Sequence, residues 1–517
     1  MKSKKPKRRD FLKAGTAGFA ALTLTKNMKA QTNGFDELHA QLRESTVLDL
    51  QAKMKSGELS ARKITEMYLD RIKAIDPQIR SVIELNPDAL KIADEMDKER
   101  KRGKVRSNLH GIPVLIKDNI DTKDKMKTTA GSLALVDAPT PKADAFIVKQ
   151  LRNAGAVILG KTNLSEWANF RSTKSISGWS GRGLQTNNPY ILTENPCGSS
   201  AGSGAAISAN LAAVAVGTET NGSIICPATR NGIVGIKPTL GLISRSGIIP
   251  IAHTQDTAGP MTRTVADAAI LLSTLVGNDK KDAITSDSRK GEKDYTKFLD
   301  KDGLKGARIG VARQFLGNSE EVKKIIEARL EILKSSGATL VDVTFPESLS
   351  KMGDDRLNVL LYEFKTNLNK YLAARDSKYK TLADLIKFNE ENKDREMPLF
   401  AQELFEQSQA KGELTDKSYT NALQKIKRAA REDGIDAVMN KDKLDAIVSS
   451  ASGATWSIAA VAGYPYITVP AGFVNRLPIG IGFFGRAFSE TQLIKFAYAF
   501  EQKTRLRLAP SFLPNAN

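Results

Sequence analysis

The chain of 517 residues is short of the features that mark a membrane-inserted or multi-part protein. Its N-terminal apolar segment, residues 14–25, is brief and rich in Gly, Ala and Thr, whereas a membrane span needs about 20 apolar residues. No cysteine lies directly after that segment, so a lipoprotein anchor is not supported. The sequence shows no Pro/Ser-rich break, internal repeat or low-complexity segment. These absences favour one globular domain, residues 31–517, without stable membrane insertion.

Cysteine is scarce: Cys197 and Cys226 are the only two. An exported protein can pair its cysteines, whereas buried cysteines are commonly small, unpaired thiols. The N-terminal pair Arg8 and Arg9 resembles a twin-arginine export signal. Proteins with such a signal fold before export, which favours reduced thiols. The sequence therefore predicts that both remain unpaired, and it assigns neither as a nucleophile.

Histidine is scarce as well, with His39, His110 and His253 as the complete set. A serine hydrolase commonly uses a histidine base held by a third group. His39 lies close to the N-terminal segment, and the other two lie in predicted loops without an obvious orienting partner. If the chain is a serine hydrolase, its histidines therefore favour a lysine base instead, since Ser–Lys arrangements also activate hydroxyl groups.

The N-terminus is basic and resembles a bacterial export signal. Paired arginines, Arg8 and Arg9, are followed by Phe-Leu-Lys and then by the weakly apolar segment, as in twin-arginine signals. We predict a signal over residues 1–30, with cleavage after Ala30, export by the twin-arginine machinery and a periplasmic or otherwise exported mature protein. A disordered basic tail is the alternative.

The net charge of +19 has the sign expected for a nucleic-acid partner, but much of it is local. Residues 1–30 contribute +8, and the remaining +11 comes from basic residues interspersed with acidic ones. Such mixing is typical of a solvated surface. We therefore expect no nucleic-acid partner.

Apolar periodicity predicts alternating helices and strands. Residues 46–75 read as two helices interrupted at Gly57, and the charged stretch 345–440 as a helical excursion over the core. Other helices are predicted over 86–102, 145–153 and 490–503, and buried strands over 114–116, 156–159, 445–449 and 466–469. This alternation indicates an α/β fold, a sheet layered by helices.

The most informative stretch runs from residue 196 to 238. A Gly/Ser loop, 198–204, precedes an apolar small-residue segment, 205–216, and a second turn, 220–223. Small residues let the backbone approach a ligand and direct N–H groups toward it. A flexible linker is the alternative for such composition, but the segment between the two loops is too apolar to be solvated. The pattern predicts a catalytic floor with one hydroxyl from each loop.

The same stretch resembles the amidase signature family. Its two loop serines, Ser199 and Ser223, are 24 positions apart, as in the family motif. Further matching blocks are Gly111–Asp118, Gly160–Asn163, Gly235–Thr239, Asp256–Met261 and the segments from Ala462 to Pro465 and at Phe483–Gly485. The resemblance covers the chain from about residue 45 onward. It implies a large mixed β-sheet covered by helices on both faces, with the catalytic core at about 110–265.

The resemblance also implies a role for each site residue. Ser223 matches the nucleophile, Ser199 the bridging serine on a cis peptide bond after Gly198, and Lys117 the base. The backbone N–H groups of Thr220, Asn221, Gly222 and Ser223 match the oxyanion hole, and no metal or cofactor is implied. To act as a base, Lys117 must be uncharged near neutral pH, against an ordinary pKa of about 10.4, and burial supplies that shift.

The sequence departs from the family motif at four positions: Glu219 replaces an aspartate, Asn221 and Cys197 replace glycines, and Ile225 replaces an arginine. None of these is a triad residue. The variant motif is closer to the peptide amidases and related exported amidases than to the amidotransferase A subunits or fatty acid amide hydrolase. Because Asn221 adds a side chain beside the oxyanion hole, the resemblance says less about substrate preference than about reaction type.

Residues 155–162 also match the phosphate-binding pattern G-x-x-x-x-G-K-[ST]. The four variable positions are Ala-Val-Ile-Leu, which must form a strand where a working phosphate loop needs a loop. We therefore assign Lys161 to the support of the core and expect no nucleotide cofactor.

Together these patterns predict an exported amidohydrolase that converts linear carboxamides to a carboxylic acid and ammonia, C-terminal peptide amides being one candidate class. Two alternatives remain open: an amidotransferase A-type subunit that passes ammonia to a partner, and a non-catalytic amidase-like binding protein. The choice among peptide, aryl and aliphatic amides and the oligomeric state stay open.

Overall fold

The computed structural model describes residues 40–317 and 319–515. Two compact units divide at residue 45. In the first unit the described residues are 40–45, which begin with a short 3-10 turn, Ala40–Leu42. The second unit begins at Thr46 and holds the rest of the described residues. The predicted export signal, residues 1–30, and His39 lie outside the described residues.

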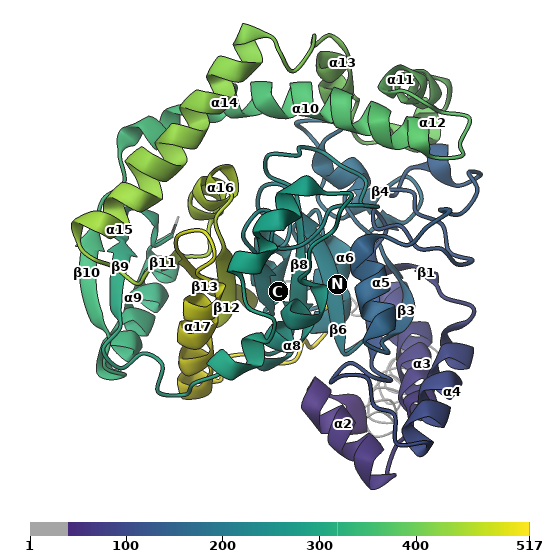
Figure 1. Ribbon diagram of the computed structural model, residues 1–517, viewed down its shortest axis with the longest axis horizontal. Coiled ribbons are helices and arrows are strands. Elements are labelled where there is room, and N and C mark those ends of the chain that lie inside the picture. The colour runs from purple at the N-terminus through teal and green to yellow at the C-terminus, as the bar shows by residue number, and fades with distance from the viewer. Residues whose placement is uncertain (1–39, 318, 516–517) are drawn as a thin grey trace, which may run out of the picture. The chain divides into compact units, whose positions relative to one another are not determined.

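The second unit is built on one large mixed sheet, and Figure 1 shows several of its strands and helices. In the described part of the chain the sheet has eleven strands in the order β1-β3-β2-β6-β8-β7-β12-β13-β11-β9-β10. The bounds are β1 Val82–Leu85, β2 Pro113–Lys117, β3 Val157–Thr162, β6 Val214–Glu219, β7 Val234–Lys237, β8 Thr257–Thr262, β9 Arg308–Ala312, β10 Thr339–Val343, β11 Ala446–Ser450, β12 Tyr466–Val474 and β13 Leu477–Phe484. Strands β4 (Trp179–Ser180) and β5 (Leu184–Gln185) form a separate small hairpin. The predicted mixed α/β fold is confirmed.

Three neighbouring strands carry the site. β2 pairs in parallel with both β3 and β6, and β6 pairs antiparallel with β8. Every residue of β2, β3 and β6 is buried, because these strands lie inside the sheet and are covered on both faces. The carboxyl ends of parallel strands meet at one edge of a sheet, so Lys117 and Glu219, the last residues of β2 and β6, lie at the same edge.

The predicted pair of N-terminal helices is present as α2 (Val47–Ser56) and α3 (Ala61–Ile79). Thr46 begins α2 with a capping box to Asp49, and Gly57 ends it in the left-handed conformation at φ 81°. The other α-helices around the sheet are α4 Ala89–Lys101, α5 Phe146–Asn153, α6 Ala201–Ser208, α7 Ile225–Arg230, α8 Val265–Leu275, α9 Glu320–Ser335, α15 Ala437–Lys441, α16 Gly453–Ala462 and α17 Glu490–Thr504. The helices predicted over 86–102, 145–153 and 490–503 therefore exist, with shifts of a few residues at their ends.

The charged stretch 345–440 is helical, as predicted. It contains α10 Gly353–Ala374, α11 Leu382–Glu391, α12 Lys393–Glu396, α13 Glu403–Gln409 and α14 Lys417–Ala430, drawn in green in Figure 1. The long helices α10 and α14 pack against each other, and α14 also packs against α16.

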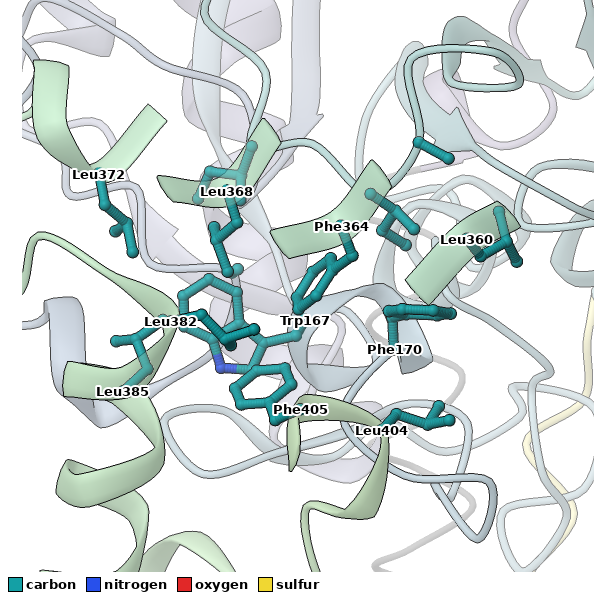
Figure 2. Packing of buried hydrophobic residues seen from close by; sticks show 14 of the residues in the cluster. Trp167, Phe170, Leu360, Phe364, Leu368, Leu372, Leu382, Leu385, Leu404 and Phe405 are labelled. Carbon is teal, nitrogen blue, oxygen red and sulfur yellow. The ribbon is translucent and has the colours of Figure 1, made fainter. Parts of the chain in front are cut away.

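An apolar cluster fastens this excursion to the loops above the sheet. Figure 2 shows Trp167 and Phe170, from the segment after β3, packed among leucines and phenylalanines of α10, α11 and α13. The rings of Phe170 and Phe364 are 4.9 Å apart, and those of Trp167 and Phe405 are 5.8 Å apart in an edge-on arrangement. Each fully buried large apolar side chain contributes about 1.5–3 kcal/mol. The excursion is therefore held in place over the β-strand ends that carry the site.

Candidate active site

Lys117 is the last residue of β2 and is completely buried. Its Nζ lies 2.7 Å from the Oγ of Ser199 and 2.9 Å from the Oγ1 of Thr218, at the end of β6. Burial lowers the pKa of Lys117 to about 7, against the opposing effects of the Asp256 and Glu219 carboxylates. A large fraction of the amine is therefore neutral near pH 7, with a lone pair available to accept a proton.

Ser199 follows a cis peptide bond from Gly198, as the resemblance implies. It lies just before α6, and the backbone N–H of the next residue, Ser200, donates to the carbonyl oxygen of Ser223 at 3.1 Å. This bond joins the two Gly/Ser loops directly. A Cβ atom on Gly198 would lie 2.2 Å from the Oγ of Ser165, so the close approach requires glycine.

Ser223 lies in the turn between β6 and α7 and retains 8% of its surface exposed. Its Oγ has no hydrogen-bond partner among the residues that the structure describes, so it is free to meet a ligand. The carboxylate of Glu219 fixes the turn by accepting from the N–H groups of Ile224 at 2.8 Å and Ile225 at 3.0 Å. Glu219, a departure from the family motif, thus caps the start of α7.

The predicted oxyanion turn, residues 220–223, is held from both sides. On one side the Oγ1 of Thr220 donates to Asp256 at 2.6 Å, and burial raises the pKa of that carboxyl to about 6. On the other, the Oγ of Ser457 donates to the Oδ1 of Asn221 at 2.6 Å. Gly222 has φ +85°, and a Cβ there would lie 2.4 Å from the indole nitrogen of Trp456. The turn has little freedom to move.

The structure brings Lys117 and Ser199 into direct contact and places Ser223 in the adjoining loop. It also adds residues that sequence analysis did not assign. The Oγ1 of Thr218 accepts a hydrogen bond from the Nζ of Lys117 and another from the Nδ2 of Asn119 at 3.0 Å. Asp256 influences both Thr220 and Lys117. Thr218 and Asp256 both lie in segments that match the family motifs, and this match was the only sign in the sequence that they belong to the site. A matching segment does not show which of its side chains faces the site.

The prediction of unpaired cysteines is wrong: Cys197 and Cys226 form a disulfide with a Cα–Cα distance of 5.8 Å. Cys197 stands two residues before Ser199, and Cys226 three residues after Ser223. The contact between the two loops places both thiols together, although 29 positions separate them in the chain. The disulfide therefore links the loop of one candidate serine to the helix that follows the other.

Neither described histidine hydrogen-bonds a candidate serine. His110 is buried and its Nε2 lies 3.0 Å from the carbonyl oxygen of Met96. His253 does have an orienting environment, which the sequence did not reveal: its Nδ1 lies 3.1 Å from Asn367 and 3.5 Å from the Glu363 carboxylate. Both partners belong to α10, a segment more than 100 residues away in sequence.

Lys161 supports the core, as predicted. It lies in β3, is fully buried, and donates to the Thr128 hydroxyl at 2.9 Å and to the carbonyl of Ile120. Strand β3 extends through Thr162, so the residues that a phosphate loop would need in an open loop are hydrogen-bonded in the sheet.

Two cavities lie beside the end of β6 and the 220–223 turn. One, of about 450 Å³, is lined by Asn119, Thr218, Thr220 and Asp256 together with the α10 residues Asn367, Lys370 and Tyr371. The other, of about 650 Å³, is lined by Asn221 together with Arg356 of α10 and Trp456 and Ser457 of α16. Residues of the helical excursion and of α16 therefore both line this second cavity.

Neither a metal site nor a membrane span is found in residues 40–317 and 319–515. These residues contain no group of three or more His, Cys, Asp and Glu side chains arranged to hold a metal ion. None of the helices in this part of the chain combines the length and apolar character needed to cross a membrane.

Comparisons with known proteins agree with this geometry. The Amidase family model matches residues 63–457. A probable amidase of Arabidopsis thaliana is 43% identical over 91% of this chain and 92% of its own length. The structure of native peptide amidase from Stenotrophomonas maltophilia is 49% identical, covers 91% of this chain and 99% of its own, and superposes with a TM-score of 0.88.

A more distant relative belongs to the amidotransferases. The glutamyl-tRNA(Gln) amidotransferase A subunit of Thermoanaerobacter pseudethanolicus is 35% identical over 92% of this chain and all of its own length. Its identity is lower than that of the two amidases, which agrees with the variant motif around Ser223. The family match, the mixed sheet and the amidase relatives lead to one conclusion: this chain belongs to the amidase signature family and is an amide-hydrolysing enzyme.

Proposed function

We propose that the enzyme releases ammonia from C-terminally amidated peptides, with Ser223 as nucleophile, Ser199 as bridging serine and Lys117 as base. The observation that carries the proposal is the 2.7 Å hydrogen bond between the buried amine of Lys117 and Ser199, in a loop bonded to that of Ser223. The 49% identity to a peptide amidase supports the choice of substrate. No metal or other cofactor is needed for this chemistry.

In the proposed reaction the Oγ of Ser223 attacks the amide carbonyl carbon. Its proton passes to Ser199 as the Ser199 proton passes to the neutral Lys117 amine. The carbonyl oxygen becomes an oxyanion facing the backbone N–H groups of residues 220–223. Loss of one such donor typically costs about 10²–10³-fold in rate. Collapse breaks the C–N bond, and ammonia leaves with a proton returned through Ser199. Water then hydrolyses the acyl-enzyme by the same route.

The test is ammonia and acid release by purified protein from a panel of amides: N-acylated peptide amides, aryl amides, aliphatic amides and free glutamine. Ser223→Ala should lower kcat/KM by at least about 10⁴-fold, because the triad acts as a unit. Ser208→Ala is the matched control, since its Oγ is buried in α6 without a hydrogen-bond partner among the described residues. It should retain the parent rate.

The panel also separates the alternatives. Highest kcat/KM for peptide amides supports the proposal, whereas preference for glutamine would favour the amidotransferase-type function. If no amide in the panel releases ammonia, and a fluorophosphonate does not label Ser223, a non-catalytic binding protein would be favoured.

We further propose that the chain is exported through the twin-arginine machinery to the periplasm or beyond. The Arg8-Arg9 signature supports this, and so does the Cys197–Cys226 disulfide, because structural disulfides persist mainly in oxidising compartments. Cell fractionation should find a shortened protein outside the cytoplasm. The Arg8→Lys/Arg9→Lys variant should remain inside at full length, and equal distribution of the two proteins would contradict export by this route.

A further inference from the structure

The cavity on the Asn221 side of the turn holds a cation, Arg356, that no carboxylate of the described residues pairs. We call this cavity the Arg356 pocket; it is lined by Asn221, Phe315, Phe345, Arg356, Trp456 and Ser457, among others. Arg356 is partly buried and lies in the first turns of α10. Its Nη1 donates to the Oγ of Ser457 at 2.7 Å. Within the described residues no carboxylate forms an ion pair with it.

The surroundings of Arg356 make this lack of a partner informative. Burial lowers the pKa of the guanidinium, and no acidic residue in the described part of the chain opposes that effect. Glu347 also lines the pocket, but it is exposed and forms no ion pair with Arg356. Partly buried charges in proteins are normally paired, because removal from water disfavours the charged form. The guanidinium therefore has donors available for a group that enters the pocket.

Asn221 supplies a second unused donor in the same pocket. Its Oδ1 is occupied, since it accepts from Ser457, but its Nδ2 is buried without an acceptor in the described part of the chain. Buried polar groups are almost always hydrogen-bonded, so an orphan amide beside a cavity indicates a missing acceptor. Asn221, two residues before Ser223, therefore has an amide group without an acceptor in the described part of the chain, and Ser457 joins it to a guanidinium that has no other side-chain acceptor among the described residues.

We propose that the Arg356 pocket is a subsite for a carboxylate carried by the acyl part of the amide substrate. The planar guanidinium matches a carboxylate in a two-point hydrogen bond, and the amide N–H of Asn221 adds another donor. Phe315, Phe345 and Trp456 form apolar walls of the pocket, and hydrogen bonds beside apolar surface are stronger than those in water. This inference rests on the proposed function and deepens it: the preferred peptide amides carry glutamate or aspartate close to the C-terminus.

The test compares pairs of N-acylated peptide amides in which one member carries glutamate and the other glutamine at the same position. In one pair that position is the residue that carries the scissile amide, and in the other pair it is the residue before it. Product acids are separated by chromatography, so that side-chain amide hydrolysis is not counted. The parent enzyme should favour the glutamate member at one of the two positions by at least about tenfold in kcat/KM. Arg356→Ala should reduce that ratio by about 10- to 100-fold, as expected for the loss of a hydrogen-bonded charge.

Two further variants separate binding from support of the turn. Ser457→Ala breaks the link between Arg356 and Asn221 but keeps the charge, so it should slow both substrates and preserve most of the ratio. Arg428→Ala removes an equal charge from an exposed position on α14, outside the pocket, and should leave the ratio unchanged. If Arg356→Ala slows the glutamate and glutamine amides equally, or if the parent shows no preference, the subsite is refuted.

A binding measurement keeps this inference independent of turnover. Calorimetry should show that the glutamate amide binds the Ser223→Ala variant about 10- to 100-fold more tightly than it binds the Ser223→Ala/Arg356→Ala double variant. Equal affinities would overturn the subsite even if the enzyme hydrolysed no amide in the panel. Conversely, hydrolysis of neutral amides without glutamate preference would leave the proposed function standing and remove only the subsite.

Discussion

Replacing Lys117 by methionine should lower kcat/KM for amide hydrolysis by at least about 10³-fold, because the side chain that accepts the proton is lost while the cavity stays filled. The amine contacts the Ser199 and Thr218 hydroxyls at 2.7 and 2.9 Å. Methionine has a similar length and no charge, so it suits a completely buried position. Ammonia release under saturating and limiting amide concentrations measures the effect, and thermal melting establishes that the variant is folded.

The pH dependence of the parent enzyme is the control for this variant. The pKa of Lys117 is lowered to about 7, and only the neutral amine accepts a proton. Below pH 7 the amine is protonated and inactive, so kcat/KM should rise with pH and reach half of its plateau near pH 7. The residual activity of Lys117→Met should lack this rise. A variant that kept the parent rate, or the same pH profile, would exclude Lys117 as the base.

Removing the disulfide should destabilise the protein by about 3–4 kcal/mol, the value expected for a closed loop of this length. The Cys197→Ser/Cys226→Ser variant frees a loop whose ends are 29 positions apart. For a chain of this size the loss corresponds to about 3–4 °C in the midpoint of thermal unfolding. Differential scanning calorimetry measures it. Because Cys197 and Cys226 stand close to Ser199 and Ser223, the variant should also hydrolyse amides more slowly.

Reductant gives the matched control for the disulfide. A phosphine reductant should lower the unfolding midpoint of the parent enzyme toward that of the variant and leave the variant unchanged. If the parent and the variant melt at the same temperature, with full oxidation of the parent verified by mass spectrometry, the link does not stabilise the fold.

Local sequence patterns predicted β2 and the two Gly/Ser loops of the site, whereas they assigned no helix or strand to the segments that form α6, β6 and α7. The apolar run Val114–Ile116 predicted a buried strand that ends at Lys117, and β2 spans Pro113–Lys117. Gly57 predicted the break between the first two helices, where it adopts a left-handed conformation. Such features depend on side-chain periodicity and backbone freedom over a few residues, which the sequence contains in full.

Contacts between distant segments could not be predicted in this way. The disulfide was missed because nothing local indicates that the Cys197 loop lies against the start of α7. The partners of His253 lie in α10, and the link from Asn221 to Ser457 spans 236 positions. The Arg356–Ser457 contact spans 101 positions. Each of these depends on how the helical excursion and α16 pack over the strand ends.

The sequence by itself determined the strand that ends at Lys117 and the two Gly/Ser loops that carry Ser199 and Ser223, and its resemblance to the amidase signature family indicated the chemical class of the site. Only the tertiary structure decided that Lys117 is poised to act, because its pKa depends on burial and on Asp256 and Glu219. It likewise decided that the two cysteines meet and that Arg356 has no counter-charge among the described residues. The physical reason is the same in each case: desolvation and charge pairing are properties of the packed surroundings, which segments far apart in the chain supply together.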